Sequence, residues 1–331
     1  LNPGVGSGDD RFDLLPEPSW RFFPTLPFRV ARELRAHPAD AIVASDPYVA
    51  AAVLIGRRLA RSRAKVIVEL HGDPRTFTRL YGSQARKSVA ALADLTARFA
   101  LRRADATRAV SSFTARLVEE VRGRPPTKTF LAYSDLSAFA DAPAVPPPHE
   151  PRVVFVGALE PYKNIDGLAD AWRQIARGNP GAVLTIVGNG SRRAVVESLL
   201  RDLPDQVVHH VELPPAAVSA ELDRARALVL PSYPEGLGRV VLEAFARGRG
   251  VIGTDGGGIP DMVSNDREGL LVPPYDTDAL VDALQRVVSD YELCVRLGAA
   301  ASETYREWHQ TPDGFAGAYR DLVDRALAGE R

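Results

Sequence analysis

The chain of 331 residues is long enough for two domains that each bury a core. Its 45% hydrophobic and 25% charged residues exclude a mostly disordered, collagen-like or disulfide-dense protein. Cys294 is the only cysteine, so an internal disulfide is excluded and a cytoplasmic location is favoured.

Charge is distributed unevenly along the chain. Residues 1–150 contain 22 Lys and Arg against 16 Asp and Glu, which leaves 19 against 26 for the remainder. A basic half beside an acidic half indicates an anionic substrate, an anionic membrane surface or two complementary domain faces. Nucleic acid is not expected as a partner, because no basic cluster is interleaved with aromatic side chains that stack on bases.

In the first half, short β-branched runs alternate with longer amphipathic segments, which is typical of βαβ units and parallel sheets. Strands are predicted at residues 40–44, 65–69, 105–110 and 128–131. Helices are predicted between them at residues 47–60, 82–103 and 112–121.

Residues 141–151 contain five prolines, so they cannot form a helix or a central strand and are predicted to be a stiff linker. A second alternating series follows, with strands predicted at residues 152–156, 182–187, 206–211, 227–230 and 250–253. Both halves are therefore predicted to be doubly wound. From Asp276 the pattern is helical, and a last helix after Thr311 is expected to return to the first domain. The expected units are residues 1–145, 146–308 and 309–331.

The run from Ala227 to Phe245 predicts a short buried strand, a loop and an amphipathic helix. Ligands of open parallel sheets bind beyond the carboxyl ends of strands, where helix N-termini offer free backbone N–H groups to anions. Gly236 and Gly238 allow a ligand to approach the backbone. Glu235 in the loop and Glu243 in the helix are candidates to accept hydrogen bonds from a vicinal diol of a ribose or sugar ring. The alternative is a capping loop followed by a surface glutamate.

Four motifs follow one another in the second half. They are Phe155-Val156-Gly157 leading to Lys163-Asn164-Ile165-Asp166; Ile186-Val187-Gly188-Asn189-Gly190; Pro231-Ser232 with Glu235-Gly236-Leu237-Gly238 and Leu242-Glu243-Ala244; and Gly257-Gly258 before Gly269-Leu270-Leu271-Val272. Together they resemble the GT-B-fold retaining glycosyltransferases of family 4. The resemblance implies two Rossmann-like α/β domains whose parallel sheets face each other across a cleft. The second domain would bind the donor and the first the acceptor.

The resemblance also implies roles for individual residues. Glu235 is expected to bind the donor sugar, with the backbone amides of Gly236, Leu237 and Gly238 on sugar and phosphate. Glu243 is expected to bind the ribose and Lys163 to neutralise the diphosphate, although Lys163 by itself would be interpreted as a solvated lysine. The remaining expected donor-binding residues are Gly157, Gly188 and Asn189.

The chain departs from the family pattern after Gly157, where family members usually have an arginine and this chain has Ala158. One phosphate-binding charge is therefore missing. Arg239 could replace it from the start of the next helix, or it could lie on the exposed flank of that helix. A family glutamate after the glycine pair corresponds to Asp261 here, to which no role is assigned.

In the first half, the predicted strand 65–69 continues into Leu70-His71-Gly72-Asp73 at the carboxyl edge of its sheet. By the resemblance, His71 approaches the donor sugar and is expected to face the cleft, with Asp73 as a possible additional site residue. A lone histidine is more often structural, which is the alternative. Family members also begin with a strand and a glycine-rich loop, whereas Leu1 to Gly8 is followed by no fitting strand–helix pair. The first domain is therefore expected to lack that unit or to be unusual.

The expected reaction transfers a sugar from a nucleotide-diphosphate donor, such as a UDP-sugar or GDP-sugar, with retention of configuration. The acceptor would be a sugar, a lipid-linked molecule or a small molecule. The donor is a substrate, so no cofactor is expected, and no metal is expected because no Cys/His group has ligand spacing. The alternatives are a non-catalytic sugar-nucleotide-binding protein or partner subunit and a GT-B epimerase or phosphorylase.

Four arginines at one predicted helix end suggest an additional partner for the basic half. They are Arg57, Arg58, Arg61 and Arg63. One interpretation of such a cluster is peripheral contact with the inner face of an anionic membrane. The alternative is that these cations complement the dipole at the helix C-terminus.

Overall fold

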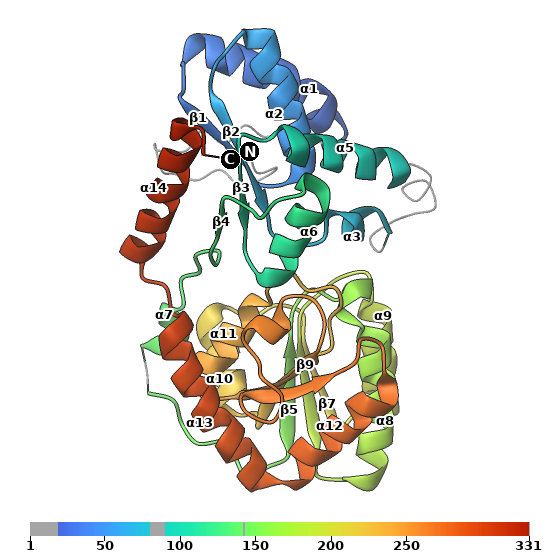
Figure 1. Ribbon diagram of the computed structural model, residues 1–331. Coiled ribbons are helices and arrows are strands. Elements are labelled where there is room, and N and C mark those ends of the chain that lie inside the picture. Colours follow the sequence, from blue (N-terminus) through green and yellow to red (C-terminus); the bar gives the residue numbers. More distant parts are fainter. Residues whose placement is uncertain (1–18, 80–89, 142, 331) are drawn as a thin grey trace.

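The computed structural model describes residues 19–79, 90–141 and 143–330. They form two lobes, each built around one parallel β-sheet with helices on its faces (Figure 1). The expectation of two α/β units with parallel sheets is confirmed. The predicted Leu1 to Gly8 segment lies outside the described residues.

The first sheet has the strand order β1-β2-β3-β4 and is parallel throughout. Its strands are β1 (Ala41–Ala44), β2 (Lys65–Leu70), β3 (Ala106–Ala109) and β4 (Lys128–Thr129). The helices of this lobe are α1 (Ser19–Ala36), α2 (Pro47–Ala60), α3 (Pro74–Arg79), α5 (Ala90–Arg103) and α6 (Ser112–Arg122). Strand β2 is buried from Val66 to Leu70, as its unbroken apolar run before Glu69 predicts for a central strand.

Helix α2 begins at Pro47 because the Asp46 carboxylate accepts hydrogen bonds from two backbone N–H groups of its first turn. Helix α1 packs against α2 so closely that a Cβ at Gly56 would lie 2.6 Å from the carbonyl oxygen of Pro27. Helix α1 was not among the predicted helices. Pro24 and Pro27 interrupt its sequence pattern, although both lie inside the helix.

The second sheet has the order β10-β9-β8-β5-β6-β7 and is also parallel. Its strands are β5 (Arg152–Val156), β6 (Val183–Val187), β7 (Val207–His210), β8 (Ala227–Leu230), β9 (Gly250–Thr254) and β10 (Gly269–Val272). Strand β10 joins the edge beside β9 and was absent from the predicted strands. The strand order reverses between β5 and β8, and such a switch point opens a crevice at the carboxyl ends of the two strands.

The second lobe has helices on both faces of its sheet. They are α7 (Ser137–Ala140), η1 (Pro161–Lys163), α8 (Ile165–Gly178), α9 (Arg193–Asp202), α10 (Pro215–Asp223), α11 (Arg239–Ala246), η2 (Ile259–Asp261), α12 (Thr277–Ser289) and α13 (Tyr291–Trp308). The last helix, α14 (Pro312–Ala328), leaves this lobe and runs beside the first one (Figure 1). There Leu322 and Ala326 pack against Ile67 and Ala106 of the first sheet.

The proline-rich linker is fixed to the second lobe by buried arginines. Proline supplies a carbonyl acceptor but no N–H donor, so such a segment needs external donors. The Arg249 guanidinium donates to the carbonyl oxygens of Val145 and Leu222 at 2.7 and 2.8 Å. Arg247 and Arg226 reach other linker carbonyls in the same way. Burial lowers the pKa of Arg249 to about 10, so the side chain remains charged at neutral pH.

Removal of the Arg249 guanidinium should destabilise the protein strongly. In Arg249→Met several buried carbonyls lose their donor, and we expect a loss of roughly 3–5 kcal/mol in the free energy of unfolding. Arg286→Met is the control, because it removes an exposed ion pair with Asp266 and should cost less than about 1 kcal/mol. Urea unfolding measures both, and equal small losses would contradict the structural role of Arg249.

Candidate active site

The crevice between β5 and β8 brings Lys163 and Glu235 together. Lys163 lies at the end of η1, which follows β5, and Glu235 lies in the loop that follows β8. The Lys163 ammonium donates to Oε2 of Glu235 at 2.6 Å, and both side chains are largely buried. The ammonium also lies 5.0 Å from the centre of the Tyr162 ring. A buried lysine and a buried carboxylate thus neutralise each other at the point where the fold places a ligand.

Glycines allow the strand ends to meet beside this pair. A Cβ at Gly188, which follows β6, would lie 1.9 Å from the carbonyl oxygen of Gly157, which follows β5. Any larger residue at Gly188 would force these backbones apart. The Asn189 side chain accepts from the backbone N–H of Gly190 at 2.9 Å and closes the turn. His209 contacts the Gly188 carbonyl oxygen through Nε2 at 2.9 Å.

Helix α11 starts directly after the loop and carries the second glutamate. Gly238 precedes it in the left-handed conformation, with φ of 83°, which glycine adopts without strain. Glu243 is buried one turn into the helix, and Arg239 Nε donates to its Oε1 at 3.2 Å. Burial raises the pKa of Glu243, and the Arg239 guanidinium opposes this rise. The Arg239 side chain is 69% exposed, so it lies on the outer flank of the helix.

The loop between β8 and α11 touches the first lobe. A Cβ at Gly236 would lie 1.9 Å from the carbonyl oxygen of His71, so only glycine fits this contact. The Ser111 hydroxyl donates to the carbonyl oxygen of Gly236 at 2.6 Å. The structure therefore brings His71 to the same place as the loop that carries Glu235.

Asp261 forms a second link between the lobes. Its carboxylate accepts from the backbone N–H of Ser112 at 2.6 Å and from the Ser112 hydroxyl at 2.5 Å. An acidic side chain at this point caps the N-terminus of α6 from the other lobe. No local sequence pattern indicates this role, because the two residues are 149 positions apart.

A network of buried polar side chains lies behind His71. His71 Nε2 is 3.2 Å from Oε2 of Glu69. The other oxygen of Glu69 accepts from Arg108 Nη1 at 2.5 Å and from the Tyr319 hydroxyl at 2.8 Å. Burial acts to raise the pKa of Glu69, but its three hydrogen-bond partners outweigh burial and lower the pKa from 4.5 to about 2.

None of Glu69, Arg108 and Tyr319 was among the predicted site residues. A usable signal was present for two of them, because charged residues within the central strands β2 and β3 are rarely buried without a partner. Tyr319 gave no signal, since nothing in the sequence of α14 shows which face of the first sheet it meets.

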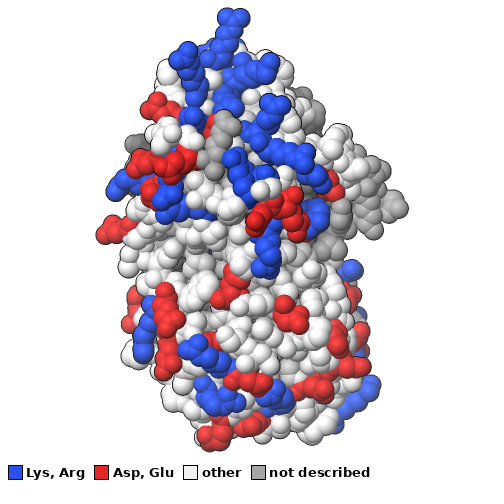
Figure 2. All heavy atoms as spheres, viewed as in Figure 1, with Lys and Arg blue, Asp and Glu red and all other residues white. Residues whose placement is uncertain are grey.

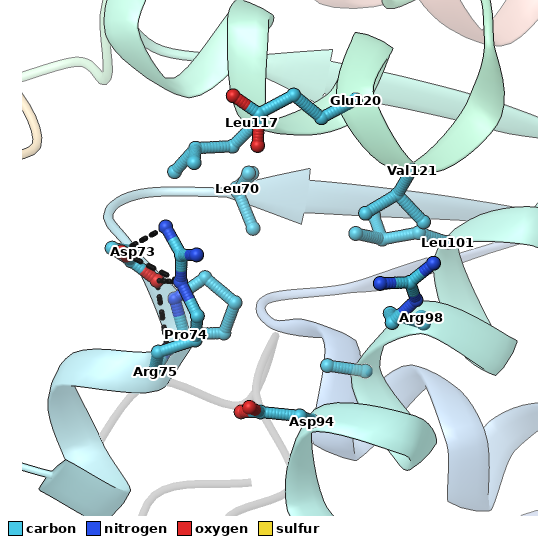
Figure 3. A pocket seen from close by; sticks show the side chains of 11 residues that line it. Leu70, Asp73, Pro74, Arg75, Asp94, Arg98, Leu101, Leu117, Glu120 and Val121 are labelled. Atoms are coloured by element: carbon cyan, nitrogen blue, oxygen red, sulfur yellow. Dashed lines mark hydrogen bonds and ion pairs between the residues drawn. The ribbon is translucent and has the colours of Figure 1, made fainter.

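Asp73 lies where pockets of the first lobe and of the cleft meet. One pocket of about 340 Å³ is lined from both lobes by Asp73, Arg75, Thr76, Phe113, Tyr233, Pro234 and Tyr275. Another, of about 260 Å³, includes Asp46, Tyr48 and His71. A third pocket, of about 250 Å³, lies between α5 and α6 (Figure 3). Figure 3 shows Asp73 and Arg75 paired at its edge, with Arg75 Nη2 2.7 Å from Asp73 Oδ2.

The described residues contain no group of three or more His, Cys, Asp or Glu side chains arranged to bind a metal ion. The acidic run Asp276-Thr277-Asp278 is used for capping, because Asp276 accepts from the backbone N–H of Ala279 at 2.9 Å. Among the same residues, no helix has the length and apolar character needed to cross a membrane.

Two parallel α/β lobes that contact each other through the loops at the carboxyl ends of their strands define the GT-B fold. Residues 139–304 match the family of glycosyl transferases group 1, and residues 3–133 match the glycosyl transferase 4-like domain. The chain belongs to the glycosyl transferases group 1 family. The resemblance seen in the sequence motifs is confirmed.

Curated relatives match about half of this chain. D-inositol 3-phosphate glycosyltransferase of Nocardia farcinica is 31% identical over 183 residues, which cover 52% of this chain and 41% of that protein. GDP-mannose-dependent alpha-(1-6)-phosphatidylinositol monomannoside mannosyltransferase of Mycobacterium tuberculosis is 34% identical over 169 residues, with coverage of 48% and 42%. The chain thus spans less than half the length of these two relatives.

Solved structures match more of the chain and support the fold. Sucrose-phosphate synthase from Thermosynechococcus elongatus superposes with a TM-score of 0.77 at 24% identity, covering 93% of this chain and 80% of that one. HepE from Anabaena in complex with UDP-glucose superposes with a TM-score of 0.72 at 18% identity, covering 93% and 84%.

The Glu69 network should make the stability of the protein sensitive to acid. Folding lowers the pKa of Glu69. The contribution of this carboxylate to the free energy of unfolding is therefore complete above pH 4.5 and is lost as the pH falls towards 2. From about pH 6 to about pH 3, the wild type should lose about 2 kcal/mol more unfolding free energy than Glu69→Gln, whose amide does not titrate. Urea unfolding at the two pH values tests this, and equal losses would contradict it.

Proposed function

We propose that this protein transfers a sugar from a nucleotide-diphosphate sugar to an acceptor, with retention of configuration and without a metal ion. The observation that supports this most directly is the buried pair of Lys163 and Glu235 at the switch point between β5 and β8. Membership of the glycosyl transferases group 1 family supports the reaction class. HepE, whose structure contains UDP-glucose, and the GDP-mannose-dependent relative support a UDP-sugar or a GDP-sugar as donor.

The donor is proposed to lie across the carboxyl ends of β5, β6 and β8. Lys163 and the backbone amides of Gly236 to Gly238 would contact the diphosphate, because the free N–H groups before α11 favour anions. Glu235 would accept hydrogen bonds from the donor sugar and Glu243 from the ribose hydroxyls. The close contact between Gly157 and Gly188 leaves backbone rather than side chains facing the nucleotide.

Binding would rearrange the Lys163–Glu235 pair. In the structure, each charge compensates the other at 2.6 Å. A bound diphosphate offers Lys163 an anion of higher charge, which frees the Glu235 carboxylate to accept from sugar hydroxyls. We therefore propose that donor binding replaces the contact between the two residues by one contact from each of them to the substrate. Neither charge is then left uncompensated in the closed site.

The chemical step needs no protein nucleophile. The bond between the anomeric carbon and the diphosphate oxygen breaks, and the acceptor oxygen forms the new bond on the same face. The acceptor proton can pass to the departing phosphate oxygen. Lys163 and the loop amides stabilise the charge that develops on the diphosphate. Because Ala158 stands where the family usually has an arginine, this chain depends more heavily on Lys163.

The acceptor is proposed to enter from the first lobe. The pocket of about 340 Å³ that contains Asp73 opens between the lobes, and its lining residues Tyr233 and Pro234 directly precede Glu235 in the chain. On the first-lobe side of this pocket, Asp73 follows His71 by two residues. A sugar, a lipid-linked molecule or a small molecule with a free hydroxyl could be placed there next to the donor.

Substitution of the charged pair tests the proposed reaction. Lys163→Ala and Glu235→Ala should each lower sugar transfer by at least about a hundredfold, because each removes a group that acts on the donor. Glu197→Ala is the matched control, since it removes an exposed ion pair with Arg193 and should leave the rate unchanged. Transfer is measured with a panel of UDP- and GDP-sugars. Wild-type rates in both Lys163→Ala and Glu235→Ala would exclude the mechanism.

A second candidate is a non-catalytic sugar-nucleotide-binding protein or partner subunit, which the missing charge at Ala158 favours. Calorimetry separates the two functions when it is combined with turnover assays on the same preparation. Binding of a nucleotide sugar with neither transfer nor hydrolysis would support the binding protein. Transfer that is abolished in Lys163→Ala would support the enzyme.

Peripheral contact of the first lobe with an anionic membrane is proposed from its surface. Figure 2 shows Lys and Arg gathered over the upper lobe. Arg58, Arg61 and Arg63 are exposed there, whereas Arg57 is paired with Asp105 at 2.5 Å. Near them, the side chains of Phe28, Ile55 and Leu59 are exposed on α1 and α2. Cations beside exposed apolar side chains are typical of surfaces that bind anionic lipids.

Liposome co-sedimentation tests this contact. The wild type should bind vesicles with anionic lipids at low salt and release them at high salt. A triple variant with Arg58→Glu, Arg61→Glu and Arg63→Glu should bind roughly a hundredfold more weakly, since each cation near such a surface contributes about 1 kcal/mol. Arg286→Glu on the second lobe is the control. Absence of wild-type binding at low salt would remove the proposal.

A further inference from the structure

Two charged residues face each other in the centre of the first sheet. Glu69 on β2 is the register partner of Arg108 on β3, and both are buried. Arg108 Nη1 donates to Oε1 of Glu69, and its Nη2 donates to the carbonyl oxygen of Leu131 at 2.5 Å. Burial of two charged side chains carries a large desolvation cost, so packing alone does not explain why the pair lies here.

Helix α14 covers this pair with aromatic side chains. The Arg108 guanidinium lies 5.5 and 5.7 Å from the ring centres of Phe315 and Tyr319, and 4.1 Å from that of Phe130. The Tyr319 hydroxyl donates to the same oxygen of Glu69 that Arg108 contacts. A helix from the far end of the chain therefore completes the hydrogen bonding of a carboxylate in strand β2.

Both donors act on Oε1, which leaves Oε2 of Glu69 for His71. Glu69 and His71 are two residues apart, a spacing that places side chains on the same side of an extended chain. Nε2 of His71 lies 3.2 Å from Oε2. Because Arg108 and Tyr319 fix one oxygen from two directions, the carboxylate cannot rotate away from the imidazole.

We propose that Tyr319 and Arg108 are positioning residues for His71 and act through Glu69. The pKa of Glu69 is low, so its carboxylate remains an acceptor and selects the imidazole tautomer with hydrogen on Nε2. Nδ1 is then the ring nitrogen that the cleft can use, and among the described residues it has no hydrogen-bond partner. The proposal rests on the proposed function, in which His71 approaches the donor sugar.

The key variant is Tyr319→Phe, which removes the hydroxyl but keeps the ring and its edge contact with Phe130. Asp321→Asn is the matched control. It removes the ion pair between α14 and Lys128, two positions along the helix from Tyr319, and leaves the contacts of Glu69 unchanged. If α14 only packs against the sheet, both variants weaken the same helix and should behave alike. If Tyr319 positions His71, only Tyr319→Phe should change the imidazole.

Two measurements distinguish these outcomes. Nitrogen NMR of the histidine rings, with His71 assigned from a His71→Gln variant, should show the Nε2–H tautomer in the wild type and in Asp321→Asn. In Tyr319→Phe it should show a mixture of tautomers. In transfer assays, Tyr319→Phe should lower kcat roughly tenfold with the donor KM within about twofold, because binding is kept while alignment is lost. Asp321→Asn should match the wild type.

An unchanged His71 spectrum in Tyr319→Phe, with kinetics equal to those of Asp321→Asn, would overturn the positioning role. The spectrum is read without any substrate, so it decides the coupling of Tyr319 to His71 even if no donor is turned over. Absence of transfer by the wild type with every donor would instead remove the proposed function. A His71 spectrum that depends on Tyr319, without any turnover, would support the coupling of Tyr319 to His71 and contradict the proposed sugar transfer.

Discussion

The position of Lys163 beside Glu235 depends on the strand order of the second sheet. Lys163 follows β5 and Glu235 follows β8, and 72 residues separate them in the sequence. They meet because β5 and β8 are neighbours in a sheet whose order reverses at this point. Both side chains are largely buried, so each charge reduces the cost of burying the other. The same topology therefore creates the crevice and brings this pair of opposite charges into it.

The contact between the lobes places a second constraint on this site. Gly236 has no side chain because the His71 carbonyl oxygen occupies that space, and Ser111 and Asp261 fix the loops on either side. These contacts include short hydrogen bonds between backbone and small polar groups. Such links can be broken and reformed at modest cost, which suits lobes that must admit a ligand and then enclose it.

Much of this architecture was predictable from the sequence, and the misses have physical reasons. Alternating β-branched and amphipathic segments predicted nine of the ten strands in the described part of the chain, because parallel strands and their helices carry strong periodicity. Helix α1 was missed since Pro24 and Pro27 resemble breakers, although a helix packed on α2 tolerates them. The motif glutamates were singled out by their place at a strand-to-helix junction and by the family resemblance, and their roles stay predictions. Contacts between distant segments, such as Asp261 with Ser112, leave no local pattern in the sequence, because they depend on how the two lobes meet.

The network behind His71 shows why charged residues in central strands merit attention. A glutamate and an arginine in buried strands violate the apolar pattern that otherwise predicts the first sheet. Replacement by apolar side chains would often cost nothing in stability, so burial of such a pair points to a task that an apolar pair cannot perform. Here the carboxylate faces an imidazole at the sheet edge, and α14 provides the hydroxyl that fixes it. The returning helix thus contributes both to the core of the first lobe and to the geometry of the cleft.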